Sequence, residues 1–578
     1  MKDTTELVQH STQHISAGVL MEEITQAYTM LEEHNICKRL FLKDATLWGT
    51  EPEQVKAINN RLGWLHLPDN FEPVMKEITA FVEQIKEEGY EYAVLLGMGG
   101  SSLCSEVAHK TFDTANGYLQ LLVLDNTSPE AIKALEAQID LEKTLFIVAS
   151  KSGGTKETIS FFKYFYQQLE TKTKSNPGNN FIAITDAGTP LVKLAKDYKF
   201  RQVFSTPTDI GGRYSVLSTF GILPMALMGI DVNALMESAK QMKDSCGTLL
   251  PVDVNPGLSL GVALGIFQKH GRDKITFVLS SSISSLGLWL EQLIAESTGK
   301  EGKGLIPIAG EKIGKPEAYD NDRIFVHIHL ASDDNEADTK KIVALKAAGH
   351  PVVSITVPDE TSLGGEYYRW EVATAIAGME MNLNPFDEPN VAESKENTEN
   401  ILDDWQRKNA FEKNPPLAKF GDITIYSSTL ATKAVADQAS IKSILFHFAS
   451  QAKPHDYIAL LPYFLMTETR EKILQTWRQD WRNNLKIAVT VGIGPRYLHS
   501  TGQLHKGGPA TGLYIIFIGE NEEDLLIPDE KYGFGVLHQA QALGDFRSLD
   551  EKGRSVLYIV LGKKIDEALI KLEHEFVL

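Results

Sequence analysis

The chain has 578 residues, of which 43% are hydrophobic, and a formal net charge of −19 at pH 7. This length predicts roughly three or four domains with a well-buried core. The negative charge argues against a nucleic-acid partner, since binding to phosphodiesters needs a basic surface. The sequence shows no membrane-spanning run and no secretory signal, and its three scattered cysteines suit a reducing compartment, so we expect a cytoplasmic enzyme.

Residues 1–80 are predicted to form a helical region without catalytic groups. From residue 81 the pattern alternates between short apolar strands and helices, which is typical of a doubly wound parallel sheet. A first domain is predicted over residues 81–250. Its expected strands are Tyr92–Leu96, Leu121–Asp125, Thr144–Ala149 and Phe181–Asp186.

A second series of the same kind predicts another domain over residues 251–395. Its expected strands are Ile275–Leu279, Ile324–Ile328 and Val352–Val357. Residues 396–420 are polar and contain a Pro-Pro pair, which indicates a linker. Residues 421–578 are predicted as a C-terminal α/β region. Its expected strands are Tyr457–Leu461, Lys486–Val491, Gly512–Ile518 and Val556–Leu561.

The chain is organised around the motif SKSGGTKET at Ser150–Thr158, which lies between a predicted strand and a predicted helix. Two glycines permit a tight loop whose backbone N–H groups converge, and the following helix N-terminus favours an anion. Ser150, Ser152 and Thr155 add hydroxyl donors. The motif therefore predicts a phosphate cradle, while an ordinary capped helix after a Gly-rich turn stays open as the alternative.

A second Gly-rich loop, Gly97–Ser102 (GMGGSS), follows the first predicted strand, and Asp125 ends the next one. This arrangement resembles a dinucleotide-binding fingerprint. However, Ser102 takes the place of the third glycine, and a dinucleotide would leave the SKSGGTKET loop unexplained. We therefore give dinucleotide binding little weight.

Two further residues suggest proton-transfer chemistry. Glu296 ends a mostly apolar helix in QLIAESTGK, and a desolvated carboxylate there gains basicity. Arg213, after two glycines, offers a cation to a developing oxyanion. A solvated helix-end glutamate and a structural ion pair are the alternatives.

The motifs GMGGSS, SKSGGTKET, GGRYS, QLIAESTGK and NPFDEPNVAESK occur in an order that resembles the glucose-6-phosphate isomerase family, which is built from two sugar-isomerase (SIS) domains. The resemblance covers nearly the whole chain. It is closest to the isomerase half of bifunctional transaldolase/glucose-6-phosphate isomerases, with the transaldolase half expected to be absent. The expected fold is two SIS-type doubly wound domains plus the C-terminal α/β region.

The resemblance also implies the roles of individual residues. Glu296 would move the proton between C2 and C1, Arg213 would stabilise the enediolate, and Lys395 and His499 would open the sugar ring. The residues that would bind the sugar phosphate are Gly100, Ser101, Ser150, Lys151, Ser152, Thr155, Gln292 and Glu388. No metal and no cofactor is implied.

The chain departs from the family pattern at two places. Glu388 stands where common members carry glutamine, and a carboxylate there would repel a substrate phosphate. The histidine motif follows NPFDEPNVAESK instead of preceding it, so His505 is a rival to His499. Since the predicted linker would let the C-terminal region fold over its own chain, we expect His499 to act in cis, in a monomer or a homodimer.

The expected function is interconversion of glucose 6-phosphate and fructose 6-phosphate. Three alternatives remain open at this point: an isomerase that also accepts mannose 6-phosphate, a non-catalytic sugar-phosphate-binding SIS protein, and an amide-transferring synthase. The last would need a glutaminase nucleophile, usually an N-terminal cysteine, whereas this chain begins Met-Lys-Asp.

Overall fold

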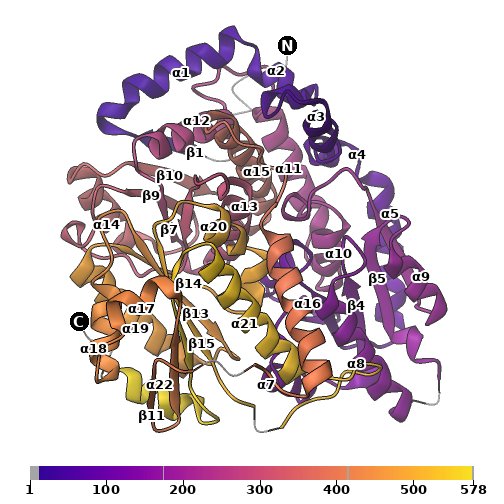
Figure 1. The fold of residues 1–578 in the computed structure, drawn as a ribbon. Coiled ribbons are helices and arrows are strands. Elements are labelled where there is room, and N and C mark those ends of the chain that lie inside the picture. Colours follow the sequence, from indigo (N-terminus) through magenta and orange to yellow (C-terminus); the bar gives the residue numbers. More distant parts are fainter. Residues whose placement is uncertain (1–11, 174, 413–414, 522, 574, 576–578) are drawn as a thin grey trace.

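The computed structural model describes residues 12–173, 175–412, 415–521, 523–573 and 575. It contains three sheets with helices packed around them, all predominantly parallel (Figure 1). The predicted α/β fold class is confirmed. Apart from β1 (Thr12–Ser16) and β11 (Ala418–Phe420), the strands of each sheet fall within one of the three predicted α/β ranges. The boundaries between those ranges stay a prediction.

The first sheet is entirely parallel, in the order β3-β2-β4-β5-β6. Its strands are β2 (Tyr92–Gly97), β3 (Gln120–Leu124), β4 (Thr144–Ala149), β5 (Phe181–Asp186) and β6 (Gln202–Thr206). Its helices are α6 (Leu103–Thr111), α7 (Pro129–Glu136), α8 (Lys156–Lys172), α9 (Pro190–Asp197), α10 (Thr219–Leu227) and α11 (Val232–Ser245). Both Gly-rich loops follow central strands at the same edge of this sheet.

The second sheet has the order β1-β10-β9-β7-β8, and only β1 runs antiparallel to its neighbour. Its strands are β1 (Thr12–Ser16), β7 (Lys274–Leu279), β8 (Ile306–Ile308), β9 (Arg323–Leu330) and β10 (Val352–Val357). Its helices are α12 (Pro256–Lys269), α13 (Leu286–Thr298), α14 (Glu336–Ala347) and α15 (Leu363–Glu380).

In the described part of the N-terminal region, residues 12–80, helices predominate, and β1 extends the edge of the second sheet. Its helices are α1 (Met21–Glu33), α2 (Ile36–Phe41), α3 (Pro52–Asn59), α4 (Leu67–Asn70) and α5 (Glu72–Glu87). They share one apolar core with α10, α11, α12 and α15, so this region and the first two sheets form one packed body.

The C-terminal sheet has the order β11-β12-β16-β15-β13-β14. Its strands are β11 (Ala418–Phe420), β12 (Ile423–Ser427), β13 (Tyr457–Tyr463), β14 (Ala488–Val491), β15 (Gly512–Ile518) and β16 (Ser555–Val560). Its helices are α17 (Thr429–Val435), α18 (Ile441–Ala449), α19 (Glu468–Leu485), α20 (Gly502–Gly507), α21 (Phe534–Glu551) and α22 (Ile565–Glu573).

The linker predicted at 396–420 is wrong. Most of it belongs to helix α16 (Val391–Lys408), and it ends in strand β11. Helix α16 is polar because it buries only a narrow stripe, which consists of Ser394, Thr398, Ile401 and Leu402. It lies beside α21, and both helices pack against the first sheet's domain (Figure 1).

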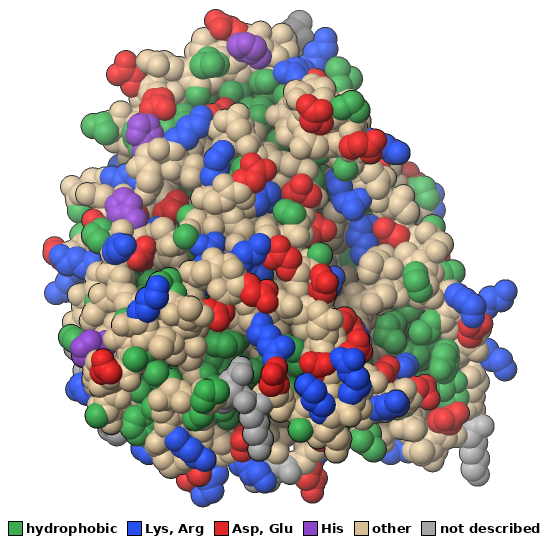
Figure 2. Space-filling view, viewed as in Figure 1, with side chains coloured by type: hydrophobic (Ala, Val, Ile, Leu, Met, Phe, Trp, Pro, Cys, Tyr) green, Lys and Arg blue, Asp and Glu red, His purple; other side chains and the backbone are tan. Residues whose placement is uncertain are grey.

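On the face shown in Figure 2, acidic and basic side chains are interspersed, without a large field of one sign. Among the described residues, no helix has the length and apolar character needed to cross a membrane.

Candidate active site

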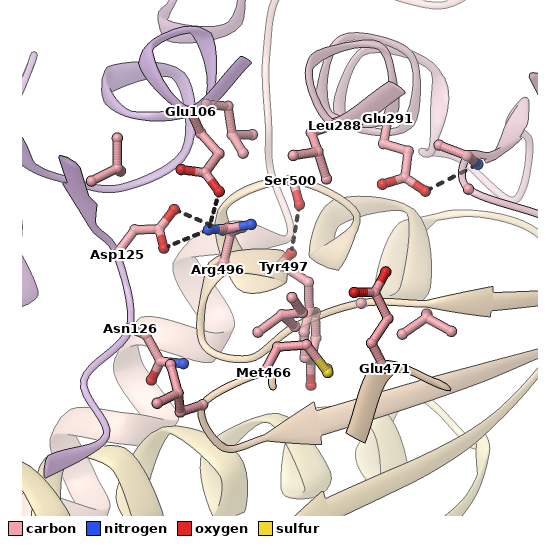
Figure 3. A pocket seen from close by; sticks show the side chains of 18 of the residues that line it. Glu106, Asp125, Asn126, Leu288, Glu291, Met466, Glu471, Arg496, Tyr497 and Ser500 are labelled. Carbon is pink, nitrogen blue, oxygen red and sulfur yellow. Dashed lines mark hydrogen bonds and ion pairs between the residues drawn. The ribbon is translucent and has the colours of Figure 1, made fainter. Parts of the chain in front are cut away.

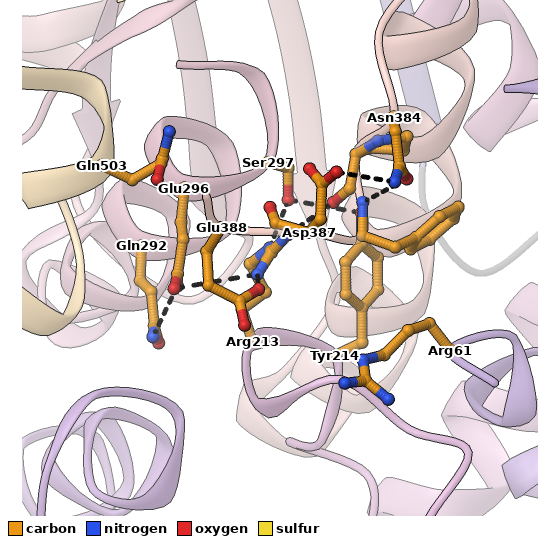
Figure 4. Close-up of polar contacts among 12 residues, drawn as sticks. Arg61, Arg213, Tyr214, Gln292, Glu296, Ser297, Asn384, Asp387, Glu388 and Gln503 are labelled. Carbon is orange, nitrogen blue, oxygen red and sulfur yellow. Dashed lines mark hydrogen bonds and ion pairs between the residues drawn. The ribbon is translucent and has the colours of Figure 1, made fainter. Parts of the chain in front are cut away.

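Helix α13 supplies the candidate base. Nearly all of its residues are buried, so its polar residues Gln292 and Glu296, one turn apart, lie inside the protein (Figure 4). The Gln292 amide donates to Glu296 Oε2 over 3.1 Å. Burial raises the pKa of Glu296 above its ordinary value, although the nearby Arg213 guanidinium works in the opposite direction. A buried glutamate with a raised pKa suits a general base.

Arg213 is held rigidly beside this base. Its guanidinium is 3% exposed and lies 3.7 Å from Glu296 Oε1. Its Nε donates to Ser297 over 2.8 Å, and its Nη2 donates to the carbonyl groups of Pro385 and Asp387. These bonds fix the cation without neutralising it, as stabilisation of a developing oxyanion requires.

Glu388 forms an ion pair of 2.9 Å with Arg213 Nη1 (Figure 4). Although burial acts in the opposite sense, Arg213 holds the pKa of Glu388 below its ordinary value, so this carboxyl group is ionised at neutral pH. The loop that carries Glu388 is tied to the end of α13 by Lys300, which donates to Asn384 O and to Asp387 Oδ1. The carboxylate is therefore directed at the cation.

The SKSGGTKET loop has the geometry of a cradle. Thr155 is the N-cap residue of α8, but its side chain makes no capping hydrogen bond. Its hydroxyl group instead lies 2.8 Å from the hydroxyl of Ser150, which is fully buried. This pairing argues against the ordinary capped helix. The Lys151 ammonium instead forms an ion pair of 2.6 Å with Asp186 and donates to the carbonyl of Pro207.

Glycines let three loops meet at this place. A Cβ atom on Gly100 would lie 2.2 Å from the Gly212 carbonyl oxygen, so GMGGSS and GGRYS can touch only without a side chain there. Gly99 has φ of +55°, and a Cβ atom on it would lie 2.7 Å from the backbone oxygen of His499. Ser101 is buried in the same turn.

His499 reaches this site from the C-terminal region of the same chain. It ends the short 3-10 helix η11 (Arg496–His499), and its backbone oxygen accepts from the Gln292 amide over 2.8 Å. Its Nε2 lies 3.0 Å from Glu157 Oε1. Because a carboxylate only accepts, Nε2 carries the proton and Nδ1 is the free ring nitrogen.

A cavity of about 130 Å³ lies between the SKSGGTKET loop, Lys395 and His499. Its lining includes Ser152, Thr155, Glu157, Lys395 and His499. The rival histidine, His505, does not line it. His505 is 2% exposed, and burial lowers its pKa well below the ordinary value, so the structure favours His499.

A much larger cavity of about 580 Å³ is lined in part by Arg496 and Tyr497 of η11 (Figure 3). Arg496 forms one wall of it, bound to Asp125 through contacts of 2.7 and 2.9 Å. Asp125 is therefore not free to bind a ribose, which removes the main support for dinucleotide binding. None of the predicted substrate-binding residues lines this cavity.

Glu157 is the residue that our sequence prediction missed. It belongs to SKSGGTKET, where we considered only the donors. Glu157, Phe161 and Phe165 share the buried face of α8 at helical spacing, and a carboxylate on such a face signals a specific partner. Although burial opposes it, the charge of His499 holds the pKa of Glu157 below the ordinary value, so the pair combines an ionised carboxylate with a histidine.

A buried base beside a fixed cation suits removal of a proton from the carbon next to a carbonyl group. Combined with two parallel-sheet domains and a hydroxyl-lined loop at the carboxyl end of a strand, this chemistry defines the class of phosphosugar isomerases. The phosphoglucose isomerase family model matches residues 73–306. Over these residues, the chain carries a phosphoglucose isomerase domain.

Curated relatives agree with this assignment. A probable glucose-6-phosphate isomerase from Methanococcus maripaludis is 29% identical in an alignment 377 positions long, which covers 59% of this chain and 84% of the relative. A glucose-6-phosphate isomerase from Leptospira biflexa is 29% identical in an alignment 400 positions long, which covers 59% of this chain and 86% of the relative.

Solved structures support the fold. The structure of a glucose-6-phosphate isomerase from Chlamydia trachomatis has a TM-score of 0.55 at 17% identity and covers 69% of this chain and 90% of its own. A hypothetical protein from Thermus thermophilus has a TM-score of 0.58 at 24% identity and covers 68% of this chain and 100% of its own.

Proposed function

We propose that this enzyme interconverts glucose 6-phosphate and fructose 6-phosphate with Glu296 as the base and His499 as the ring-opening acid, and that both residues act within one chain. The observation that carries the proposal is the buried Glu296 beside Arg213, bridged by Gln292 to the backbone of His499. The motif resemblance to the isomerase half of bifunctional transaldolase/glucose-6-phosphate isomerases supports the same roles.

Ring opening comes first. The protonated His499 ring gives a proton from Nδ1 to the ring oxygen O5 as the C1–O5 bond breaks, and the O1 hydroxyl loses its proton to solvent. Glu157 holds the imidazole through Nε2 and stabilises its positive charge. Lys395, which lines the same cavity, stabilises negative charge on the sugar oxygens.

Isomerisation follows in the open chain. Glu296 takes the proton from C2, the C1 carbonyl oxygen becomes an enediolate oxygen, and Arg213 stabilises its charge. A proton then passes between O1 and O2, and the Glu296 carboxyl group returns its proton to C1. The electron pair of the C2–H bond ends in the new C1–H bond, so no oxidant or reductant is needed.

A coupled assay of the purified protein tests the function, with glucose 6-phosphate formed from fructose 6-phosphate as the readout. Turnover of at least about 1 s⁻¹ is expected, as for ordinary enzymes. Isomerisation of mannose 6-phosphate without isomerisation of glucose 6-phosphate would contradict the proposed specificity. Absence of turnover with every hexose phosphate would contradict the enzyme activity.

The cradle leads to a binding prediction. Replacing Ser150 and Thr155 by alanine removes two hydroxyl donors, each worth about 1.5–3 kcal/mol to a charged acceptor. We expect calorimetry to show much weaker binding of glucitol 6-phosphate, which has no carbonyl group, with a smaller change in the free energy of unfolding. Ser160→Ala, a buried serine farther along α8, is the matched control. A loss of stability without a loss of affinity would favour the capped-helix interpretation.

Glu388 leads to a pH prediction. Its negative charge helps to raise the pKa of Glu296 and competes for Arg213. In Glu388→Gln we therefore expect the acidic limb of kcat/KM, which rises as Glu296 ionises, to move to lower pH. We also expect KM to fall only roughly twofold to fivefold, because solvent at the 42% exposed side chain of Glu388 weakens this ion pair.

The control for this variant is Glu393→Gln on α16, since Glu393 pairs with Lys552 away from the site. An unchanged acidic limb in Glu388→Gln, or a limb moved to higher pH, would contradict the assignment of that limb to Glu296.

A further inference from the structure

A chain of hydrogen bonds continues from the His499–Glu157 pair into helix α21 of the C-terminal region. The Gln541 amide nitrogen lies 2.7 Å from Glu157 Oε1, the same oxygen that contacts His499. Gln541 Oε1 lies 2.7 Å from the Thr127 hydroxyl, which in turn lies 2.9 Å from His538 Nδ1. The chain thus connects both sides of the domain contact.

The chemistry of its end groups fixes the direction of every bond in this chain. An ionised carboxylate only accepts, so Gln541 must present its NH₂ group to Glu157 and its carbonyl oxygen to Thr127. The Thr127 hydroxyl therefore donates its single proton to Gln541. It can then only accept from His538, which must carry its proton on Nδ1.

The surroundings agree with this direction. His538 is 2% exposed, and burial lowers its pKa to about 4, so it is neutral and has one ring proton to donate. A hydrogen bond with the backbone of Tyr463 acts against this shift. Gln541 is 3% exposed and Thr127 is fully buried, so water does not replace these contacts.

The other groups around Glu157 are charged or titratable, whereas Gln541 is neutral. The charged and titratable groups around Glu157 are His499 from η11, Lys395 and Glu399 from α16, Tyr463 from β13, and Lys156 on its own helix. The Lys156 ammonium forms an ion pair with Glu399. Gln541 is an uncharged side-chain donor, so it can hold the carboxylate without competing for its negative charge.

We infer that Gln541 is a positioning residue for the ring-opening step, and that it acts by orienting Glu157 and thereby the His499 ring. This inference rests on the proposed function. It adds that the C-terminal region contributes both the catalytic histidine and the support of its carboxylate partner. Thr127 and His538 set the orientation of the Gln541 amide.

Two substitutions of Gln541 test the inference by their effect on the pH dependence of turnover. In Gln541→Glu the new carboxyl group keeps the shape and donates to Glu157 only while it is protonated. As the pH rises it loses that proton and two carboxylates face each other. We expect turnover of cyclic fructose 6-phosphate close to wild type at low pH and about tenfold to hundredfold lower at high pH. Gln541→Met, which never donates, should show that loss at every pH.

Controls separate this role from simple packing. Gln539→Glu makes the same chemical change two residues earlier on α21 and should leave the pH profile unchanged. Thr127→Val removes the hydroxyl group that orients the Gln541 amide, so it should also lower turnover. Its effect should largely disappear in a Gln541→Met background, because both changes break one chain.

The outcomes are distinct. If the wild-type enzyme shows no isomerase activity, the proposed function fails whatever the variants do. If the wild type is active and both Gln541 variants keep its turnover and pH profile, the inference is wrong. If Gln541→Glu loses the same fraction of activity at every pH and its melting temperature falls in parallel, Gln541 only packs, and the inference is equally wrong.

Discussion

Glu296→Gln is expected to lower isomerase turnover by about three to four orders of magnitude while binding of the sugar phosphate persists. The amide fits the space of the carboxylate beside Gln292 and Arg213 but has no basic lone pair for the C2 proton. Proton NMR in D₂O measures the same step directly: exchange of the C2 proton of glucose 6-phosphate should stop together with turnover.

Glu301→Gln is the matched control, since Glu301 is an exposed carboxylate just beyond the end of α13. It should retain wild-type exchange and turnover. Near-native exchange at C2 in Glu296→Gln would remove Glu296 from its role as the base.

The second large effect concerns His499. His499→Ala should lower turnover of the cyclic substrate by about 10²–10³-fold, because the ring oxygen then has no positioned acid. In one chain, the backbone of His499 contacts Gln292 and its ring contacts Glu157. A mixture of Glu296→Gln and His499→Ala chains should therefore show no more activity than the two variants show separately, since no chain has both residues.

Exchange of subunits must be verified in this mixture with differently tagged chains. Recovery of activity in mixed oligomers would show that the site is shared between subunits and would contradict action in cis. A wild-type chain mixed with His499→Ala serves as the control, with activity proportional to the wild-type fraction.

Much of the fold follows from local sequence. Buried parallel strands such as β4 are continuous apolar runs, and every predicted strand is present in the structure. Strand β1 was missed because its residues, TQHIS, are mostly polar and pair only at a sheet edge. Helix α16 was mistaken for a linker because a polar helix with a narrow buried stripe has little apolar signal.

Part of the candidate site likewise follows from local sequence, and the rest depends on tertiary packing. Glu296 and the Ser150–Thr155 loop carry local signals, since each is defined by the strand or helix next to it. The contacts of His499 with Glu157, and of Glu157 with Gln541, join segments more than 300 residues apart and depend on how the domains pack. For Lys151 the local signal was misleading: its place in the motif suggested a phosphate ligand, whereas in the structure its ammonium group pairs with Asp186.

The packing of α21 on the first sheet's domain has a consequence for biosynthesis. Phe534 stacks on Phe161 of α8 with ring centroids 5.6 Å apart. At roughly 5–20 residues per second, His499 is synthesised roughly 10–40 s after Glu296. During that interval the nascent chain has the proposed base but not the proposed ring-opening histidine, and the apolar face of α8 is not yet covered by α21. Such a chain is inactive and prone to aggregation, so a truncated product should depend on chaperones and contribute no isomerase activity.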